Sequence, residues 1–416
     1  RILLSSPSMW PKVSQGVTTV VTGNCGIGLA PVTLPAGPVP PPLNLFGGPE
    51  QFRFPTMSSY LAAVEDAGPV VNVAPLVGHS ALRFTVMADL DRPATGVETA
   101  RMRALLSEAL EAGAIGFSTG LFYPTNSGAD VAEVSAMVAD VAAAGGVYAT
   151  HMRDEGDRID AAIEEALGTA AAAAAPLIIS HHKCIGPQNW GGTRRTLTRI
   201  AEASRHQDVA LDAYPYTAGS TVLLPDLVDE RIRILICWSE PHPEMAGRDL
   251  AEVASILACS QAEAAKRLSP AGACYFFVAE EDVRRVLASP MTMIGSDGLP
   301  HDQHPHPRLW GTFPRILGHY VREVGLFALE VAVHKMTGLP ARKFGLRERG
   351  AIKSGYYADI VIFDPQAIID RATYENPHVP SDGVDLVMVN GQVASRRGVQ
   401  TSSRPGRVLR RAPLLR

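Results

Sequence analysis

Residues 145–183 read GGVYATHMRDEGDRIDAAIEEALGTAAAAAAPLIISHHK, and this stretch decides the fold. A short apolar run ends in His151, an Ala-rich segment of helical composition follows, and a second apolar run ends in His181, His182 and Lys183. Two strands joined by a helix form a parallel pair, because a parallel connection needs a crossover of a dozen or more residues. His151 and His181 therefore follow neighbouring parallel strands, where α/β barrels place their chemistry.

The same alternation of strand and helix continues on both sides of this unit. Apolar, β-branched runs of strand length are separated by segments of helical composition, which favours an α/β fold with a buried parallel sheet. Asp130 is placed to cap the helix that leads into Gly145. The further predicted strands cover residues 13–23, 70–77, 114–118, 208–213 and 291–295.

Two segments depart from the barrel rhythm. From about residue 221 to 285 the sequence predicts a mostly helical insertion, and after residue 345 it changes to short strands with Gly-rich and Asp-rich turns. We therefore expect a barrel domain over residues 1–344, with the insertion at about 221–285, and a small β domain over residues 345–416.

Composition limits the function classes. The chain has 416 residues, 46% of them hydrophobic, and a net charge of −4, which gives no electrostatic case for binding nucleic acid or an anionic membrane. Its five cysteines are scattered and indicate no disulfide framework, and no stretch resembles a signal peptide. These features predict a cytoplasmic protein and leave the oligomeric state open.

Four residues that can carry chemistry each follow a predicted barrel strand: Cys25, His151, His181 and Asp297. A single cysteine or histidine in such a place is more often an ordinary packed residue. Two imidazoles delivered to one rim are instead a metal-site pattern, and a thiol at a matching strand end strengthens it. His182 points to the other face of its strand if the alternation holds, which favours a structural role.

The chain resembles the D-aminoacylases (N-acyl-D-amino-acid deacylases) of the amidohydrolase superfamily. The resemblance covers nearly the whole length and implies a distorted (β/α)8 barrel, a small β-sandwich, and zinc-dependent hydrolysis of an N-acyl-D-amino acid. The motifs that carry it are GVTTVVTGNCG, GFSTGLFYP, THMRDE, SHHK, DAYPYTAGST, GSDGLP and HPRLWGTFPRILG.

One departure from the family pattern is large. Family members carry a His-X-His-X-Asp segment at the end of the first barrel strand, immediately before the point that matches Arg1. The expectation is therefore an N-terminally truncated chain, with a TIM-like barrel lacking its first strand and an incomplete β-sandwich. Such a chain lacks two ligands of the weaker metal position.

The resemblance also assigns roles. Cys25, His151 and His181 match the family's tightly bound zinc, and three ligands leave a fourth position for water. Asp297 is expected to act as general base and acid, taking a proton from the attacking water and returning it to the leaving amine. The competing interpretation of Asp297 is a helix cap.

Four more residues match positions where the family holds its substrate: Lys183, Tyr214, Ser220 and Arg308. An N-acyl amino acid presents a carboxylate beside the scissile amide, and arginine or lysine is its natural partner. An isolated lysine is more often solvated surface, but Lys183 lies two residues past a candidate ligand.

Three alternatives remain open from the sequence. One is another amidohydrolase acting on a dipeptide or cyclic amide. A second is a metal-free hydrolase with Cys25 as nucleophile, which predicts indifference to chelators. The third is an inactive, truncated chain.

Overall fold

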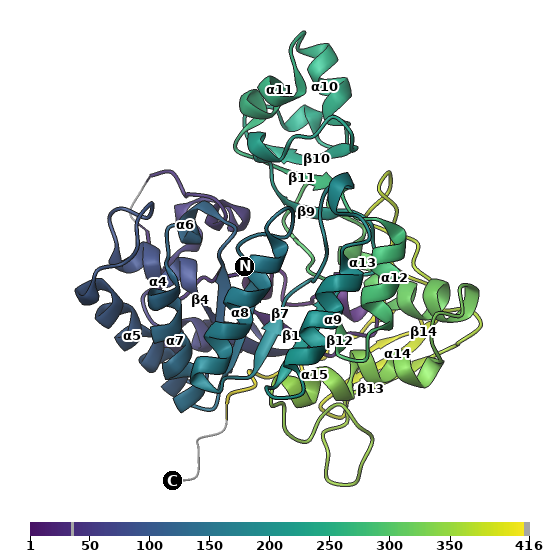
Figure 1. Ribbon diagram of the computed structural model, residues 1–416. Helices are drawn as coiled ribbons and strands as arrows, with labels where there is room; N and C mark the ends of the chain where they lie inside the picture. Colours follow the sequence, from purple (N-terminus) through teal and green to yellow (C-terminus); the bar gives the residue numbers. More distant parts are fainter. Residues whose placement is uncertain (35–36, 412–416) are drawn as a thin grey trace.

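Seven parallel strands form one curled sheet at the centre of the molecule (Figure 1). The structure is a computed structural model and describes residues 1–34 and 37–411. Five of the strands are buried along their whole length, and a sixth, β8, nearly so, as expected of a parallel sheet covered by helices. In sheet order the strands are β1 (Thr19–Thr22), β4 (Asn72–Gly78), β5 (Gly116–Gly120), β6 (Val147–His151), β7 (Leu177–Ile179), β8 (Val209–Ala213) and β12 (Thr292–Ile294).

Helices cover the outside of this sheet (Figure 1). Asp130 caps α7 as predicted, since its carboxylate accepts a hydrogen bond from the Glu133 amide. The parallel sheet with its covering helices confirms the predicted α/β barrel. Among the described residues, β1 and β12 are the edge strands of the sheet. The helices between the strands are α3 (Met57–Ala67), α4 (His79–Val86), α5 (Gly96–Glu111), α6 (Pro124–Ser127), α7 (Val131–Ala143), α8 (Ile159–Ala173), α9 (Thr193–Ala203) and α12 (Glu280–Ala288).

The first predicted strand, over residues 13–23, is wrong in its length. Only β1 is extended; Val13 instead ends the short helix α2 (Trp10–Val13), which has Pro11 in its first turn. Gly16, with a φ of 86°, then turns the chain into the strand. A second short helix, α1 (Ile2–Ser5), precedes α2, and a two-stranded ribbon of β2 (Val32–Thr33) and β3 (Arg53–Phe54) follows β1.

The segment predicted as mostly helical, residues 221–285, contains strands that the prediction missed. An antiparallel sheet in the order β10, β11, β9 projects away from the barrel together with α10 and α11 (Figure 1). Its strands are short and are spaced by helices, so the sequence shows helical periodicity more strongly than strand alternation. The elements are β9 (Gly219–Val222), β10 (Ile234–Ser239), β11 (Ala271–Tyr275), α10 (Leu250–Ile256) and α11 (Gln261–Leu268).

The last third of the chain wraps the barrel with helices and ends in a separate antiparallel sheet. Near the end, Leu409 donates a backbone hydrogen bond to Val73 of β4, at 2.7 Å, and so ties the chain end to the barrel. Within residues 1–34 and 37–411, no helix is long and apolar enough to cross a membrane. These elements are α13 (Arg308–Arg315), the π-helix η6 (Ile316–Glu323), α14 (Leu329–Met336), α15 (Gly338–Lys343), β13 (Ile360–Phe363), β14 (Val384–Val389), β15 (Gln392–Arg396) and β16 (Val399–Gln400).

Candidate metal centre and substrate-binding residues

The structure brings Cys25, His151 and His181 together at the carboxyl ends of β1, β6 and β7. One ligand atom from each of them lies within 4.8 Å of the others, and the Cys25 Sγ is 3.2 Å from the His181 Nε2. All three side chains are buried. Both ring nitrogens of His151 lack a hydrogen-bond partner, which is costly for buried polar atoms. A thiol, two imidazoles and unpaired nitrogens in one buried place fit a zinc ion.

Local backbone geometry turns these side chains inward. Cys25, His181 and Asp297 all have a positive φ, at 53°, 38° and 45°, which is uncommon for residues other than glycine. Such strain clusters at functional sites, where the surrounding structure holds it. Asn24 helps to hold it here, because its side-chain amide pairs with the Ser180 hydroxyl at 3.1 Å and so joins the loop before Cys25 to the loop before His181.

The electrostatics of the cluster favour a bound cation. Burial raises the pKa of the Cys25 thiol well above its ordinary value, and the Asp297 carboxylate adds to this shift. Burial also lowers the pKa of His181 to about 3 and that of His151 well below its usual range. Both imidazoles are therefore neutral and able to donate a lone pair, while a metal ion deprotonates a coordinating thiol.

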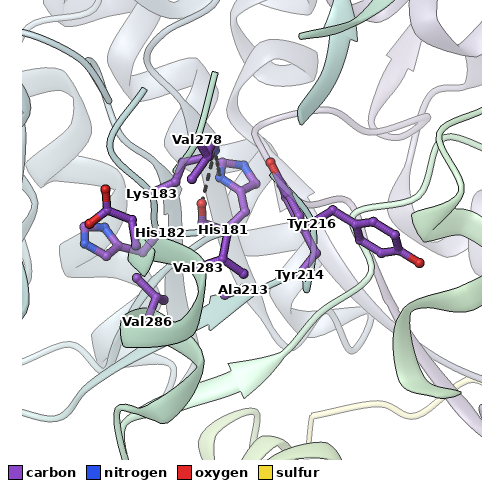
Figure 2. Close-up of a pocket in the computed structure, with 10 residues that line it drawn as sticks. His181, His182, Lys183, Ala213, Tyr214, Tyr216, Val278, Val283 and Val286 are labelled. Carbon is purple, nitrogen blue, oxygen red and sulfur yellow. Dashed lines mark hydrogen bonds between the residues drawn. The ribbon is translucent and has the colours of Figure 1, made fainter. Parts of the chain in front are cut away.

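Glu155 lies behind the histidines and joins them to Lys183. Its carboxylate is 3.1 Å from the His181 Nδ1, 2.7 Å from the Lys183 Nζ and 3.6 Å from the His151 Nε2. Figure 2 shows Lys183 folded back toward His181, whose carbonyl oxygen accepts a hydrogen bond from it at 3.1 Å. Burial lowers the pKa of Lys183, but the charge and hydrogen bond of Glu155 together with the charges of Tyr214 and Asp297 outweigh burial, and the pKa is raised overall.

Arg308, Asp297 and Tyr214 form a second group beside the metal ligands. The Arg308 Nη1 lies 2.8 Å from the Asp297 Oδ2, and the guanidinium carbon lies 4.5 Å from the centre of the Tyr214 ring. Lys183 approaches the same ring, at 5.9 Å. Arg308 is only 1% exposed, yet its Nε has no hydrogen-bond partner. A buried guanidinium with an unused donor is suited to bind a carboxylate.

Ser220 contributes to this group through its backbone. Its carbonyl oxygen accepts a hydrogen bond from the Arg308 Nη2 at 3.0 Å, whereas its hydroxyl faces the Cys237 Sγ at 3.7 Å. His182 points away from the cluster, and its Nε2 bonds the Thr196 hydroxyl at 2.8 Å, in agreement with a structural role (Figure 2).

Three further residues lie beside the candidate metal ligands or beside Asp297, and the sequence did not predict them. Asp212, at the end of β8, accepts a hydrogen bond from the His181 amide at 2.9 Å, and burial raises its pKa to about 7. Lys12 donates to the Ser296 hydroxyl at 2.8 Å, next to Asp297. Glu155 is the third. The only sequence signal for Glu155 is its position four residues after His151, and that for Asp212 is its strand end.

Comparisons with known proteins agree with this geometry. A profile described as "Amidohydrolase family" matches residues 3–394. The D-aminoacylase of Alcaligenes xylosoxydans xylosoxydans is 52% identical over 98% of this chain and 84% of its own length. The N-acyl-D-glutamate deacylase of the same organism is 46% identical over 99% of this chain and 83% of its own.

Two crystal structures are similar over almost the whole chain. That of a D-aminoacylase superposes with a TM-score of 0.96 at 53% identity and covers 98% of this chain and 86% of its own. The N-acyl-D-glutamate deacylase of Bordetella bronchiseptica, complexed with zinc and a phosphonate that mimics the tetrahedral intermediate, gives 0.95 at 45% identity, covering 99% and 86%. The chain belongs to the amidohydrolase family and, within it, to the D-aminoacylases or N-acyl-D-amino-acid deacylases.

Proposed function

We propose that this chain hydrolyses the amide bond of N-acyl-D-amino acids, with zinc as cofactor, and releases a carboxylate and a free D-amino acid. The observation that carries the proposal is the buried thiol and two imidazoles placed beside an arginine with an unused donor. Relatives at about half identity are named for this reaction, and one is complexed with zinc.

Cys25, His151 and His181 would hold the zinc ion. When bound, zinc supplies a Lewis acid for the amide carbonyl and lowers the pKa of water. His151 is the last residue of β6, and Cys25 and His181 follow the strands β1 and β7 of the same sheet within three residues, so the sheet sets the spacing of the three ligands. This rigidity keeps the ligands in place before the substrate arrives.

Asp297 is our candidate for the proton-transferring group. Its negative charge acts to raise the pKa of Cys25 and of His181 on one side, and its carboxylate pairs with Arg308 on the other. In the proposed reaction Asp297 accepts a proton from the attacking water and passes it to the nitrogen of the leaving amine. The ion pair with Arg308 fixes the position of the Asp297 carboxylate beside the metal ligands, as a general base requires.

Arg308, Lys183 and Tyr214 are our candidates for holding the substrate, with Ser220 supporting Arg308 through its carbonyl oxygen. The guanidinium offers its donors to the substrate's α-carboxylate. With the carboxylate fixed there and the amide carbonyl fixed at the metal, only one hand of the α-carbon places its side chain in the remaining space. Selectivity for one enantiomer follows from these fixed points, and the names of the relatives identify it as the D form.

The alternative with Cys25 as a metal-free nucleophile fits the site less well. A nucleophilic cysteine needs a lowered pKa, usually from a neighbouring cation or a helix N-terminus. Burial and the Asp297 charge raise the pKa of Cys25 instead.

Two wider features of the chain complete the proposal. We propose a cytoplasmic location, which is supported by the cysteines, because all five are free although the Sγ atoms of Cys237 and Cys274 are 3.4 Å apart. The division into a barrel over residues 1–344, with its insertion, and a small β domain over residues 345–416 likewise stays a proposal.

The test is a measurement of zinc content and hydrolysis on the same samples. Protein treated with a chelator and then reloaded with zinc is assayed on N-acetyl-D-methionine and on its L-enantiomer. We expect about one tightly held zinc per chain, activity that is lost with the metal and returns with it, and D-selectivity. Full activity in metal-free protein would contradict the proposal, and hydrolysis of a dipeptide or cyclic amide alone would favour another amidohydrolase reaction.

A further inference from the structure

Glu155 combines features that a purely structural glutamate does not need. It lies in the loop between β6 and α8, is 4% exposed, and has its carboxylate enclosed by a metal-ligand candidate and a substrate-binding candidate. Burying a carboxylate is unfavourable unless it is paired and hydrogen-bonded. Here the pairing is with Lys183 and the hydrogen bond is with His181, so a single side chain touches both halves of the site.

The contact between Glu155 and His181 decides which ring nitrogen of His181 has a lone pair available for a metal. The Nε2 of His181 faces the Cys25 Sγ at 3.2 Å, so this nitrogen must carry the lone pair if it is to bind a metal. The proton of the neutral ring then lies on Nδ1. Glu155, 3.1 Å from Nδ1, can only accept a hydrogen bond there and so favours this tautomer.

Lys183 favours the other tautomer of His181. Its Nζ is 2.9 Å from the same Nδ1, and an ammonium group can only donate. Without Glu155, Lys183 would be the hydrogen-bond partner of Nδ1, the ring proton would move to Nε2, and the lone pair facing Cys25 would be lost. Glu155 also draws the ammonium group to itself, since its oxygens lie 2.7 Å from Nζ.

We propose that Glu155 is a positioning residue with two effects: it holds His181 in the tautomer that binds the metal, and it holds Lys183 in place for the substrate. The inference rests on the proposed function for its second effect, while the first concerns metal binding alone. It predicts that Glu155 and Lys183 are coupled, because the harm done by losing the carboxylate is caused in part by the lysine that remains.

The experiment measures zinc affinity by competition with a chromophoric chelator, and kcat and KM on N-acetyl-D-methionine, in four variants. These are Glu155→Leu, Glu155→Ala, Lys183→Met and the double variant Glu155→Ala with Lys183→Met. The control is Glu165→Gln, which removes a carboxylate of the neighbouring helix α8 that bonds Arg153 and contacts no residue of the site. Circular dichroism and thermal unfolding of the metal-free proteins report on folding.

We expect Glu155→Ala to weaken zinc binding about 10- to 100-fold, as loss of an outer partner of a metal-bound histidine does. Lys183→Met should leave zinc affinity within about threefold and raise KM by about tenfold, the loss of roughly one charge-assisted contact. In the double variant zinc binding should be tighter than in Glu155→Ala alone. Glu165→Gln should match the parent chain in both measurements.

Two results would overturn the inference. Unchanged zinc affinity in a folded Glu155→Leu or Glu155→Ala protein would show that His181 needs no such partner. Equal zinc affinities in Glu155→Ala and the double variant would show that Lys183 does not compete for Nδ1. If Glu155→Ala fails to fold, Glu155→Leu decides the outcome, because leucine fills most of the space of the glutamate and cannot accept a hydrogen bond. A parent chain that binds zinc but hydrolyses no N-acyl-D-amino acid would refute the proposed function and leave the affinity result in force.

Discussion

Two buried clusters in this molecule contain the same kinds of side chain and differ in what they leave unsatisfied. In the first, which we call the Glu133 cluster, Glu133 contacts Arg83 at 2.6 Å and His79 at 2.9 Å, between α4 and α7. In the second, the Glu155 cluster, Glu155 contacts Lys183 and His181 at the mouth of the barrel. Both glutamates are almost completely buried.

The difference lies in the remaining polar atoms. Arg83 uses every nitrogen of its guanidinium, donating to Glu133 and to the carbonyl oxygens of Thr125, Leu90 and Arg92. Around Glu155, by contrast, both ring nitrogens of His151 and the Nε of Arg308 have no hydrogen-bond partner, whereas in the Glu133 cluster the Nδ1 of His79 alone has none. A buried carboxylate, histidine and cation therefore do not mark a functional site by themselves. The mark of a functional site is several unused donors and acceptors gathered beside them.

The strongest test of this distinction removes a metal ligand from the Glu155 cluster. We expect Cys25→Ala to bind no zinc at the parent's affinity and to lose hydrolysis to below detection, because two imidazoles alone hold zinc poorly. The metal-free variant should unfold at a temperature close to that of the metal-free parent. Elemental analysis and calorimetry check both statements, and a Cys25→Ala protein that keeps zinc and activity would contradict the ligand assignment.

The next largest effect is expected at Asp297. Like Glu133, Asp297 pairs with an arginine, but we propose that it also transfers a proton. Asp297→Asn keeps the shape of the side chain and removes its basicity. We expect kcat to fall about 10²- to 10⁴-fold, the usual contribution of a general acid or base. Zinc content should stay the same, since Asp297 is not among the three clustered ligands. An unchanged kcat would reassign Asp297 to a structural role.

The two clusters also show what sequence can and cannot reveal. The strand that ends at His151 and the strand that ends three residues before Asp297 were predictable, because apolar, β-branched runs followed by a polar residue are local signals. The strand predicted over residues 13–23 was too long, because a helix with proline in its first turn and Gly16 interrupt the apolar run. The composition of that run suits a helix as well as a strand. The roles of Glu155 and the unused donor of Arg308 depend on which partners surround them, and that is set by tertiary packing.

A smaller effect is expected from the two arginines, which offer a matched pair. Arg308→Lys keeps the charge but loses the planar fork that can bind a carboxylate through two donors. We expect kcat/KM to fall about 10- to 100-fold, mostly through KM, with little change in stability. Arg83→Lys should lower stability and leave KM unchanged, because the hydrogen bonds of Arg83 hold the fold together and do not face the substrate. Steady-state kinetics and urea unfolding of both variants separate the two patterns, and a raised KM in Arg83→Lys would break the comparison.

The Glu133 cluster is expected to leave catalysis unchanged and to govern stability in acid. Burial alone would raise the pKa of Glu133, but hydrogen bonds from His79, Arg83 and the Ala94 amide outweigh burial and lower it from 4.5 to about 2. In the unfolded chain the carboxylate has its ordinary pKa. The stabilisation it provides is therefore complete above about pH 4.5 and is lost as the pH falls from there toward 2.

Glu133→Gln makes this prediction measurable. At neutral pH the variant should be destabilised by ~3 kcal/mol, because it leaves the Arg83 charge buried without its partner, while kcat stays within about twofold of the parent. As the pH falls below 4.5 the two proteins should converge, since the parent progressively loses the pairing that the variant lacks. Urea midpoints of the zinc-loaded and metal-free proteins at pH 7, 4.5 and 3 check this. A constant gap across that range would mean that the shape of the glutamate, and not its charge, holds the cluster together.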